Sequence, residues 1–131
     1  MHKVYLKPGK EESLKRFHPW IFSGAIARFD GEPEEGEVVE VYTSKKEFIA
    51  EGHFQIGSIA VRVLSFRQEP IDHDFWKRKL QIAYDMRCGI GIAVNPTNDT
   101  YRLVHGEGDN LPGLVIDIYA RTAVMLSLIH I

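Results

Sequence analysis

The stretch Lys15-Arg16-Phe17-His18-Pro19-Trp20-Ile21-Phe22-Ser23-Gly24-Ala25-Ile26 decides how this chain folds. Two cations run into an aromatic residue, a histidine and a proline, and aromatic and aliphatic residues then alternate. Pro19 disfavours helical backbone at the residue before it, so the short helix predicted over 11–17 should end near His18. An extended segment should begin immediately afterwards.

Two aromatic residues beyond the proline, Trp20 and Phe22, are separated by one position. In an extended segment they share one face, and Ile21 takes the other. Ser23-Gly24 then breaks the strand and can turn backbone amides outward. Two interpretations stay open at this point. The stretch is either a helix-to-strand corner packed by aromatics or a nucleic-acid contact site of cations, imidazole, indole and hydroxyl.

Size and composition are those of an ordinary globular chain. Its 131 residues suit one compact domain or two small modules, and 44% hydrophobic with 26% charged residues exclude a disordered or fibrous protein. No apolar run is long enough to span a membrane, and the N-terminus has no apolar signal core. The single cysteine, Cys88, excludes an internal disulfide and a zinc cluster of cysteines. These features predict a cytoplasmic protein without a membrane partner.

Charge is distributed unevenly along the chain. The net charge of −2 argues against nucleic acid, yet residues 1–28 have a surplus of four positive charges and residues 30–51 a surplus of six negative charges. A polyanion would be attracted to the first region and repelled by the second, although both regions could equally be solvated faces. The cations of the first region are Lys3, Lys7, Lys10, Lys15, Arg16 and Arg28.

Residues 1–67 are predicted to form a small, mostly antiparallel β-barrel. Strand-like runs occur at 4–7, 37–42, 48–54 and 58–66, and turn-forming residues separate them. Closely spaced strands in so short a segment favour a barrel, because closure removes free strand edges. The residues expected in its core are Val39, Val41, Phe48, Phe54, Val61 and Val63.

Residues 68–131 are predicted to form a partial α+β domain, which makes the fold class α+β. A helix over 72–88 should start with Asp72 as its N-cap and close with the glycine that follows Cys88. Strands at 101–105 and 114–119 should flank a turn, and a third should run from 122 to 131. The apolar stripe of the helix comprises Phe75, Trp76, Leu80, Ile82, Ala83 and Met86.

Three nearby carboxylates, Glu107, Asp109 and Asp117, suggest a metal site, because hard cations bind oxygen ligands. Their spacing is not that of a calcium loop, however, and Asp109-Asn110 more simply stabilises its own turn through side-chain-to-backbone hydrogen bonds. Gly106-x-Gly108 is too short for a nucleotide-binding loop. We therefore predict no metal ligand.

Two motifs carry a resemblance to a known family. The stretch from His18 to Ile26 is similar to the PUA signature of bacterial class I S-adenosylmethionine-dependent methyltransferases that methylate a cytosine of 23S ribosomal RNA at carbon 5. Arg102, Gly106-Glu107-Gly108-Asp109-Asn110-Leu111-Pro112-Gly113-Leu114 and Asp117-x-Tyr119 are similar to the linker-domain signature of that family. Those proteins begin with a PUA domain (a small RNA-binding β-barrel), continue into an α+β linker domain and end in a Rossmann-like catalytic domain. The resemblance extends to about Met125.

The chain departs from the family pattern at several points. Phe17 stands where the family often has glycine, and Gly108 and Asn110 replace alanine and glycine, although asparagine tolerates left-handed backbone. The glycine-rich cofactor loop, the Asp-Pro-Pro motif and the catalytic cysteine of the family do not occur in this sequence. The resemblance therefore implies that S-adenosylmethionine belongs to a longer parent, and we expect this chain alone to have no catalytic or cofactor-binding residues. Residues 126–131 do not resemble the continuation in the family.

The resemblance and the charge pattern together predict an RNA-binding N-terminal fragment of an S-adenosylmethionine-dependent rRNA methyltransferase, truncated before its catalytic domain. The alternatives are a stand-alone PUA-type RNA-binding module without enzymatic activity and a barrel that binds protein instead of RNA. The implied partner is RNA, 23S ribosomal RNA in particular, and the oligomeric state stays open, a homodimeric parent included. The residues expected to contact RNA are Lys7, Lys10, Lys15, Arg16, His18, Trp20 and Ser23.

Overall fold

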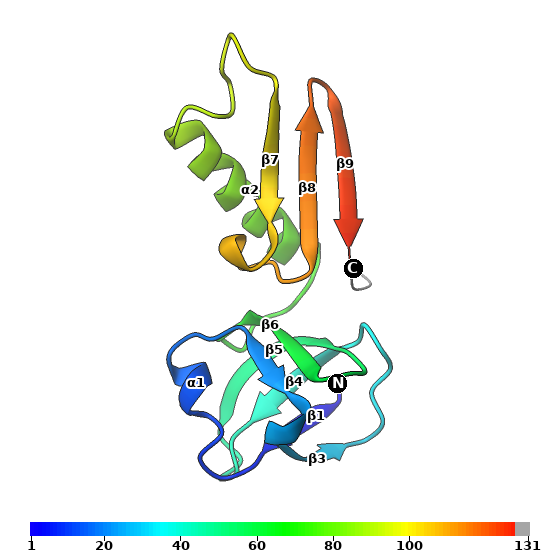
Figure 1. The fold of residues 1–131 in the computed structure, drawn as a ribbon. Coiled ribbons are helices and arrows are strands. Elements are labelled where there is room, and N and C mark those ends of the chain that lie inside the picture. The colour runs from blue at the N-terminus through cyan, green and yellow to red at the C-terminus, as the bar shows by residue number, and fades with distance from the viewer. Residues whose placement is uncertain (128–131) are drawn as a thin grey trace. The chain divides into compact units, whose positions relative to one another are not determined.

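The chain divides into two compact units in a computed structural model that describes residues 1–127 (Figure 1). The first unit is Met1–Glu69, and the second begins at Pro70. A six-stranded sheet forms the first unit, and a three-stranded sheet with one long helix forms the second, so the predicted α+β class is confirmed. Among residues 1–127, no helix has the length and apolar composition needed to cross a membrane.

The sheet of the first unit has the strand order β2-β6-β5-β4-β1-β3. All neighbouring strands are antiparallel except β1 and β4, which are parallel. Its two edge strands, β2 and β3, are consecutive in the chain and are joined by the 3-10 turn η1 (Ser23–Ala25), so the sheet must curl to bring its edges together. The strands are β1 (Lys3–Leu6), β2 (Trp20–Phe22), β3 (Ile26–Asp30), β4 (Val38–Tyr42), β5 (Phe48–Phe54) and β6 (Ile59–Ser65).

Sequence periodicity did not predict β3. Its first residue is half-buried and the remaining four are exposed, so the strand carries almost no hydrophobic signal of its own. Pairing with β1 holds it in place, in a register that sets Val4 opposite Phe29 and Tyr5 opposite Arg28. A strand that depends on pairing with its partner in this way cannot be predicted from its own hydrophobic pattern.

The short helix α1 (Glu12–Lys15) is shorter than the predicted span of 11–17, and Pro19 does not end it. Phe17 adopts left-handed backbone (φ 62°), its N–H donates to the Leu14 carbonyl at 2.9 Å, and the His18 N–H donates to the Ser13 carbonyl at 3.0 Å. This pair of bonds is the Schellman motif, in which the left-handed position is usually glycine. A bulky residue there costs about 1–2 kcal/mol of backbone strain.

A single hydrophobic cluster fills the first unit. Four of the six residues expected in the core belong to it, and Phe54 packs against it half-buried. The expectation for Phe48 was wrong: a β-bulge between Val41 and Tyr42 sets Phe48 opposite Tyr42, and the two rings meet edge to face at 5.9 Å. The buried members are Val4, Leu6, Leu14, Ile21, Val39, Val41, Ala50, Val61 and Val63.

The second unit is an antiparallel sheet in the order β7-β8-β9, with α2 (His73–Gly89) packed against its first strand (Figure 1). Its hydrophobic cluster contains one helix residue, Ala83, and residues of the sheet and its turns, with Trp76 and Leu80 packed against them. The helix residue Phe75 is buried as well. The strands are β7 (Thr100–His105), β8 (Leu114–Tyr119) and β9 (Thr122–Ser127). The predicted last strand is thus present to Ser127, and 128–131 lie outside the described residues.

Helix α2 begins as predicted and ends differently. The Asp72 carboxylate accepts the N–H of Phe75 at 3.0 Å, so the predicted N-cap is confirmed. Gly89 is the last helical residue, and the left-handed position falls at Gly91 (φ 78°). The apolar stripe is narrower than expected, because Ile82 and Met86 are more than half exposed.

Gly52 provides a test of the β5–β6 pairing. A Cβ at this position would collide with the backbone carbonyl of Arg62 and lie 2.8 Å from the Cα of Val63. We expect Gly52→Ala to lower the free energy of unfolding by about 1–3 kcal/mol, because strand backbone cannot give way as a side chain can. The matched control is Gly24→Ala, whose Cβ meets nothing within 4 Å. Equal melting temperatures for the two variants would contradict so close an approach of β6 to Gly52.

Candidate nucleic-acid interface

Three rings, those of His18, Trp20 and Phe22, gather on the edge strand β2. The ring centroids of His18 and Trp20 are 6.0 Å apart, and Phe22 lies 6.4 Å from each of them. Ile21 points the other way and is 3% exposed in the core, whereas Phe22 is 48% exposed. The corner is therefore packed by the aliphatic residue, and the aromatic side chains form a partly exposed cluster beside it.

The imidazole of His18 is oriented by the strand it precedes. Its Nδ1 lies 3.2 Å from the backbone N of Trp20 and 3.3 Å from the Trp20 carbonyl oxygen. When Nδ1 accepts the Trp20 N–H, the neutral ring carries its proton on Nε2 as an N–H. Because the side chain is exposed, that N–H can donate a hydrogen bond to a ligand. His18 thus presents both a ring edge and a donor in the cluster.

Two of the predicted cations, Lys7 and Lys10, lie on the turn after β1. The Lys7 N–H donates to the Ala25 carbonyl at 2.8 Å, which ties this turn to η1, and the Lys10 N–H donates to the Lys7 carbonyl at 3.1 Å. Lys10, Trp20 and Phe22 all line one hollow of about 340 Å³. The structure thus brings Lys10 to the ring cluster, although the two are distant in sequence.

Lys15, Arg16 and Ser23 are all exposed, and they surround the ring cluster in sequence. Lys15 pairs with Glu12 at 3.6 Å, and because both side chains are 59% exposed the pair is weak and leaves the ammonium accessible. The Ser23 N–H donates to the Ser58 carbonyl at 2.8 Å, so this amide does not turn outward as expected. Only the Ser23 hydroxyl can serve a ligand.

Arg62 joins the site, and sequence reasoning did not select it. It lies directly opposite Trp20 in the β2–β6 pairing and opposite His53 in the β5–β6 pairing, so the three residues share one face of the sheet. The Arg62 Nε is buried and has no hydrogen-bond partner among the described residues. Because Val61 and Val63 point into the core, the sequence predicts that Arg62 between them points to the opposite face of β6. The sequence does not predict that Arg62 lies beside the Trp20 indole, because this depends on the register between β2 and β6.

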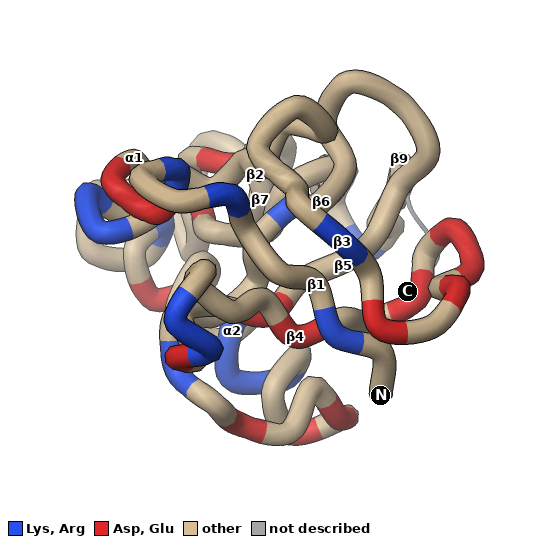
Figure 2. The backbone as a smooth tube through the Cα atoms, turned by 90° about the horizontal axis from the view of Figure 1, so that it is seen from below, with Lys and Arg blue, Asp and Glu red and all other residues tan. Residues whose placement is uncertain are grey.

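The basic and acidic residues of the first unit are separated in space, as they are along the sequence. Figure 2 shows basic segments on both sides of α1 and an acidic loop beyond β3. Residues 31–36 of that loop are three glutamates together with two glycines and a proline, and they follow Asp30 at the end of β3. A polyanion near the first unit is therefore attracted toward α1 and β2 and repelled from the β3–β4 loop.

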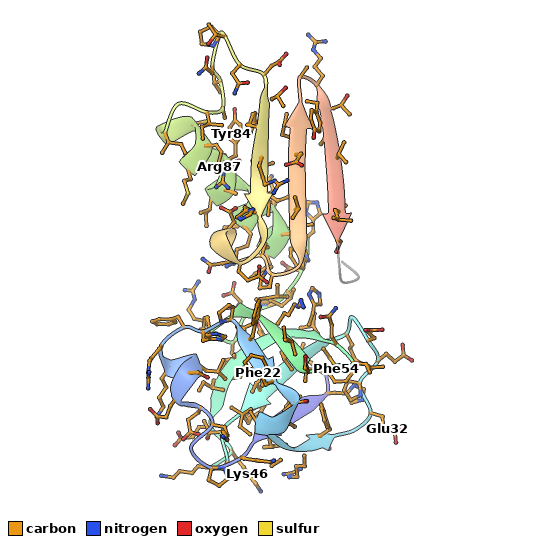
Figure 3. All side chains as sticks on the ribbon, viewed as in Figure 1. Phe22, Glu32, Lys46, Phe54, Tyr84 and Arg87 are labelled. Atoms are coloured by element: carbon orange, nitrogen blue, oxygen red, sulfur yellow. The ribbon has the colours of Figure 1, made fainter. Side chains whose placement is uncertain are left out.

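Arginines bind two of the three carboxylates that suggested a metal site, Asp109 and Asp117. Arg87 of α2 (Figure 3) binds Asp109 through two bonds of 2.6 and 2.8 Å, and the His105 N–H adds a third of 2.6 Å, so the predicted turn role of Asp109 is confirmed. Arg102 binds Asp117 at 2.7 and 3.2 Å and lowers the pKa of that carboxyl. Asn110 takes the left-handed backbone foreseen for it, at φ 56°.

Burial alone would raise the pKa of Asp109, but the Arg87 guanidinium and the His105 N–H outweigh it and hold that pKa below its ordinary value. The Arg87–Asp109 pair thus ties α2 to the turn after β7, because it links side chains from both. In residues 1–127, no group of three His, Cys, Asp or Glu side chains is arranged to hold a metal ion.

The described residues do not fit S-adenosylmethionine. In residues 1–127, β6 is the strand that leads into the long helix, and its connection, 66–72, contains no glycine. The N-terminal amides of α2 are capped by Asp72, so an acidic side chain already occupies the place where a negatively charged ligand group would bind.

Comparison with known proteins matches the first unit to a family of domains. Residues 4–66 match the family model of the PUA-like domain. Over 125 residues, the chain is 40% identical to "Ribosomal RNA large subunit methyltransferase I" of Erwinia tasmaniensis, with 94% of this chain and 31% of that protein covered. The proteins of that name from Vibrio cholerae and Aliivibrio fischeri are 41% and 44% identical, and each match covers 88% of this chain and 29% of the relative.

Solved structures agree on the fold. A candidate SAM-dependent methyltransferase from Streptococcus mutans superposes with a TM-score of 0.77 at 20% identity, covering 95% of this chain and 32% of its own. A candidate methyltransferase solved in complex with SAH gives 0.78 at the same identity and coverage. The chain thus spans about 30% of the length of the relatives it matches.

His53 should make the first unit sensitive to acid. It is 2% exposed, and burial lowers its pKa to about 4 from 6.5. The unfolded chain takes up this proton below pH 6.5 while the folded chain resists until about pH 4, so stability should fall across that window by on the order of 3 kcal/mol and then level off.

Urea unfolding at about pH 7 and about pH 4.5 checks this prediction, with His53→Gln as the comparison. The neighbouring Glu51 acts in the opposite sense, because burial raises the pKa of its carboxyl. The difference between the wild type and His53→Gln isolates the histidine from that contribution. The same pH dependence in both proteins would contradict a buried neutral imidazole.

Proposed function

We propose that this chain is the RNA-binding N-terminal part of an S-adenosylmethionine-dependent rRNA methyltransferase, and that its PUA-like unit contacts the RNA. The observation that carries the proposal is the partly exposed cluster of His18, Trp20 and Phe22 on the edge strand of a PUA-like fold, with Lys10 in the same hollow. The relatives at about 40% identity support ribosomal RNA as the partner.

Each part of the cluster has a chemical role in this proposal. Lys7, Lys10, Lys15 and Arg16 bind phosphates, because they are exposed cations on the positive side of the unit. Rings at an open strand edge suit an unpaired base, which stacks on an aromatic face, whereas a base within a duplex is already stacked. His18 and the Ser23 hydroxyl supply hydrogen bonds to base or sugar.

Catalysis and cofactor binding lie outside residues 1–127 in this proposal. The titles of the structural neighbours, a SAM-dependent methyltransferase and a complex with SAH, support S-adenosylmethionine as the cofactor of the longer protein. We also propose a cytoplasmic location, because the relatives are named for ribosomal RNA. We also propose that residues 1–67 act as an independent RNA-binding domain and that 68–131 begin the linker domain. A stand-alone RNA-binding module is the alternative, because the described residues do not fit the cofactor.

Charge reversal tests the phosphate contacts. We expect Lys15→Glu/Arg16→Glu to weaken binding of a single-stranded RNA and to reduce the salt slope of log K by about 0.7 for each lost contact. The matched control is Lys45→Glu/Lys46→Glu, which changes the same number of charges at an exposed hairpin of the same unit. Fluorescence anisotropy over a salt series measures both. Equal losses in the two double variants would show a general charge effect and no site at α1.

Trp20 can report on the RNA directly. The chain has two tryptophans, so Trp76→Phe in the second unit leaves Trp20 as the sole indole fluorophore. We expect RNA to quench this emission, and Trp20→Ala to cost about 1–3 kcal/mol of binding energy if one base stacks on the ring. Trp20→Phe should retain most of the affinity. A folded Trp20→Ala variant with wild-type affinity would remove Trp20 from the interface.

A further inference from the structure

Phe17 combines three features that packing does not explain. It occupies the left-handed position of a helix cap (φ 62°), where a bulky side chain is strained. Its side chain is 72% exposed, so the strain is not repaid by burial in the core. It lies between Arg16 and His18, two residues of the candidate interface. Strained backbone that persists at a surface is a frequent mark of a functional position.

The exposed ring is nevertheless held in place. Its edge meets the ring of Phe66 with centroids 5.2 Å apart and planes at 87°. Phe66 is itself half-buried against the core of the first unit, so the ring that Phe17 contacts is held in place by the core. A ring held in advance loses little side-chain entropy when a ligand stacks on it, which favours binding.

We propose that Phe17 is a base-stacking residue of the RNA interface, which lets the site take an unpaired base in addition to the one at the His18-Trp20-Phe22 cluster. The proposal rests on the function proposed above. It names the ligand more narrowly, as single-stranded RNA with neighbouring unpaired bases. A duplex gains nothing from Phe17, because its bases are already stacked on each other.

The test compares a labelled single-stranded RNA with its duplex of the same sequence, using the full chain. Phe17→Gly should weaken single-strand binding by about fivefold or more and leave duplex binding unchanged. Its melting temperature should equal or exceed that of the wild type, because glycine relieves the left-handed strain. Phe17→Tyr should restore single-strand affinity.

Phe29 offers the matched control. It is 39% exposed and meets Phe54 edge to face at 5.5 Å, but it lies on β3 in extended backbone. We expect Phe29→Leu to leave the affinity for both RNAs unchanged, and Phe17→Leu to reduce single-strand affinity as Phe17→Gly does.

The outcomes separate the two proposals. If Lys15→Glu/Arg16→Glu weakens RNA binding and Phe17→Gly binds as the wild type does, the stacking role is wrong and the interface stands. If Phe17→Gly lowers the melting temperature and weakens both RNAs equally, Phe17 is a structural residue. If the wild type binds neither RNA, both proposals fall.

Discussion

The first unit depends on the short connection between the two edges of its sheet. Residues Ser23–Ala25 span from β2 to β3, which are the outermost strands, so the sheet curls to bring its two edges together. The bond from the Lys7 N–H to the Ala25 carbonyl fixes the β1 turn to this connection. Ile21 anchors the same corner in the core. The aromatic neighbours of Ile21 stay on the other face of β2, where Trp20 and Phe22 share a hollow with Lys10 of the β1 turn.

The candidate interface contains features that lower the stability of the first unit locally. Phe17 holds left-handed backbone, and His53 and Arg62 bury polar groups on the face that carries Trp20. Such features are tolerated only where surrounding contacts outweigh them, and here the hydrophobic cluster beneath the sheet does so. The second unit is stabilised differently, by arginine–carboxylate pairs that tie its helix and strands together.

Much of the fold could be predicted from residues alone. The alternation of Trp20, Ile21 and Phe22 predicted that Ile21 and the two aromatic side chains lie on opposite faces, because adjacent residues of a strand face opposite ways, although the structure decided that Ile21 is the one in the core. Asp72 determined the start of α2, because a cap acts on amides only three residues away. Asp109 and Asn110 likewise determined their own turn. Each of these features depends on residues close together in the chain, so each can be predicted from the sequence.

Tertiary structure decided what depends on partners distant in the chain. The strand β3 exists through its pairing with β1, and a bulge in the β4–β5 pairing removes Phe48 from the core. Strand register alone brings Arg62 beside Trp20, and chain closure brings Lys10 to the same hollow. The sequence by itself determined the residue types of the candidate interface and their order. Which of them meet was decided by strand register, bulges and the curl of the sheet, because these arise from hydrogen bonds between segments that no local pattern connects.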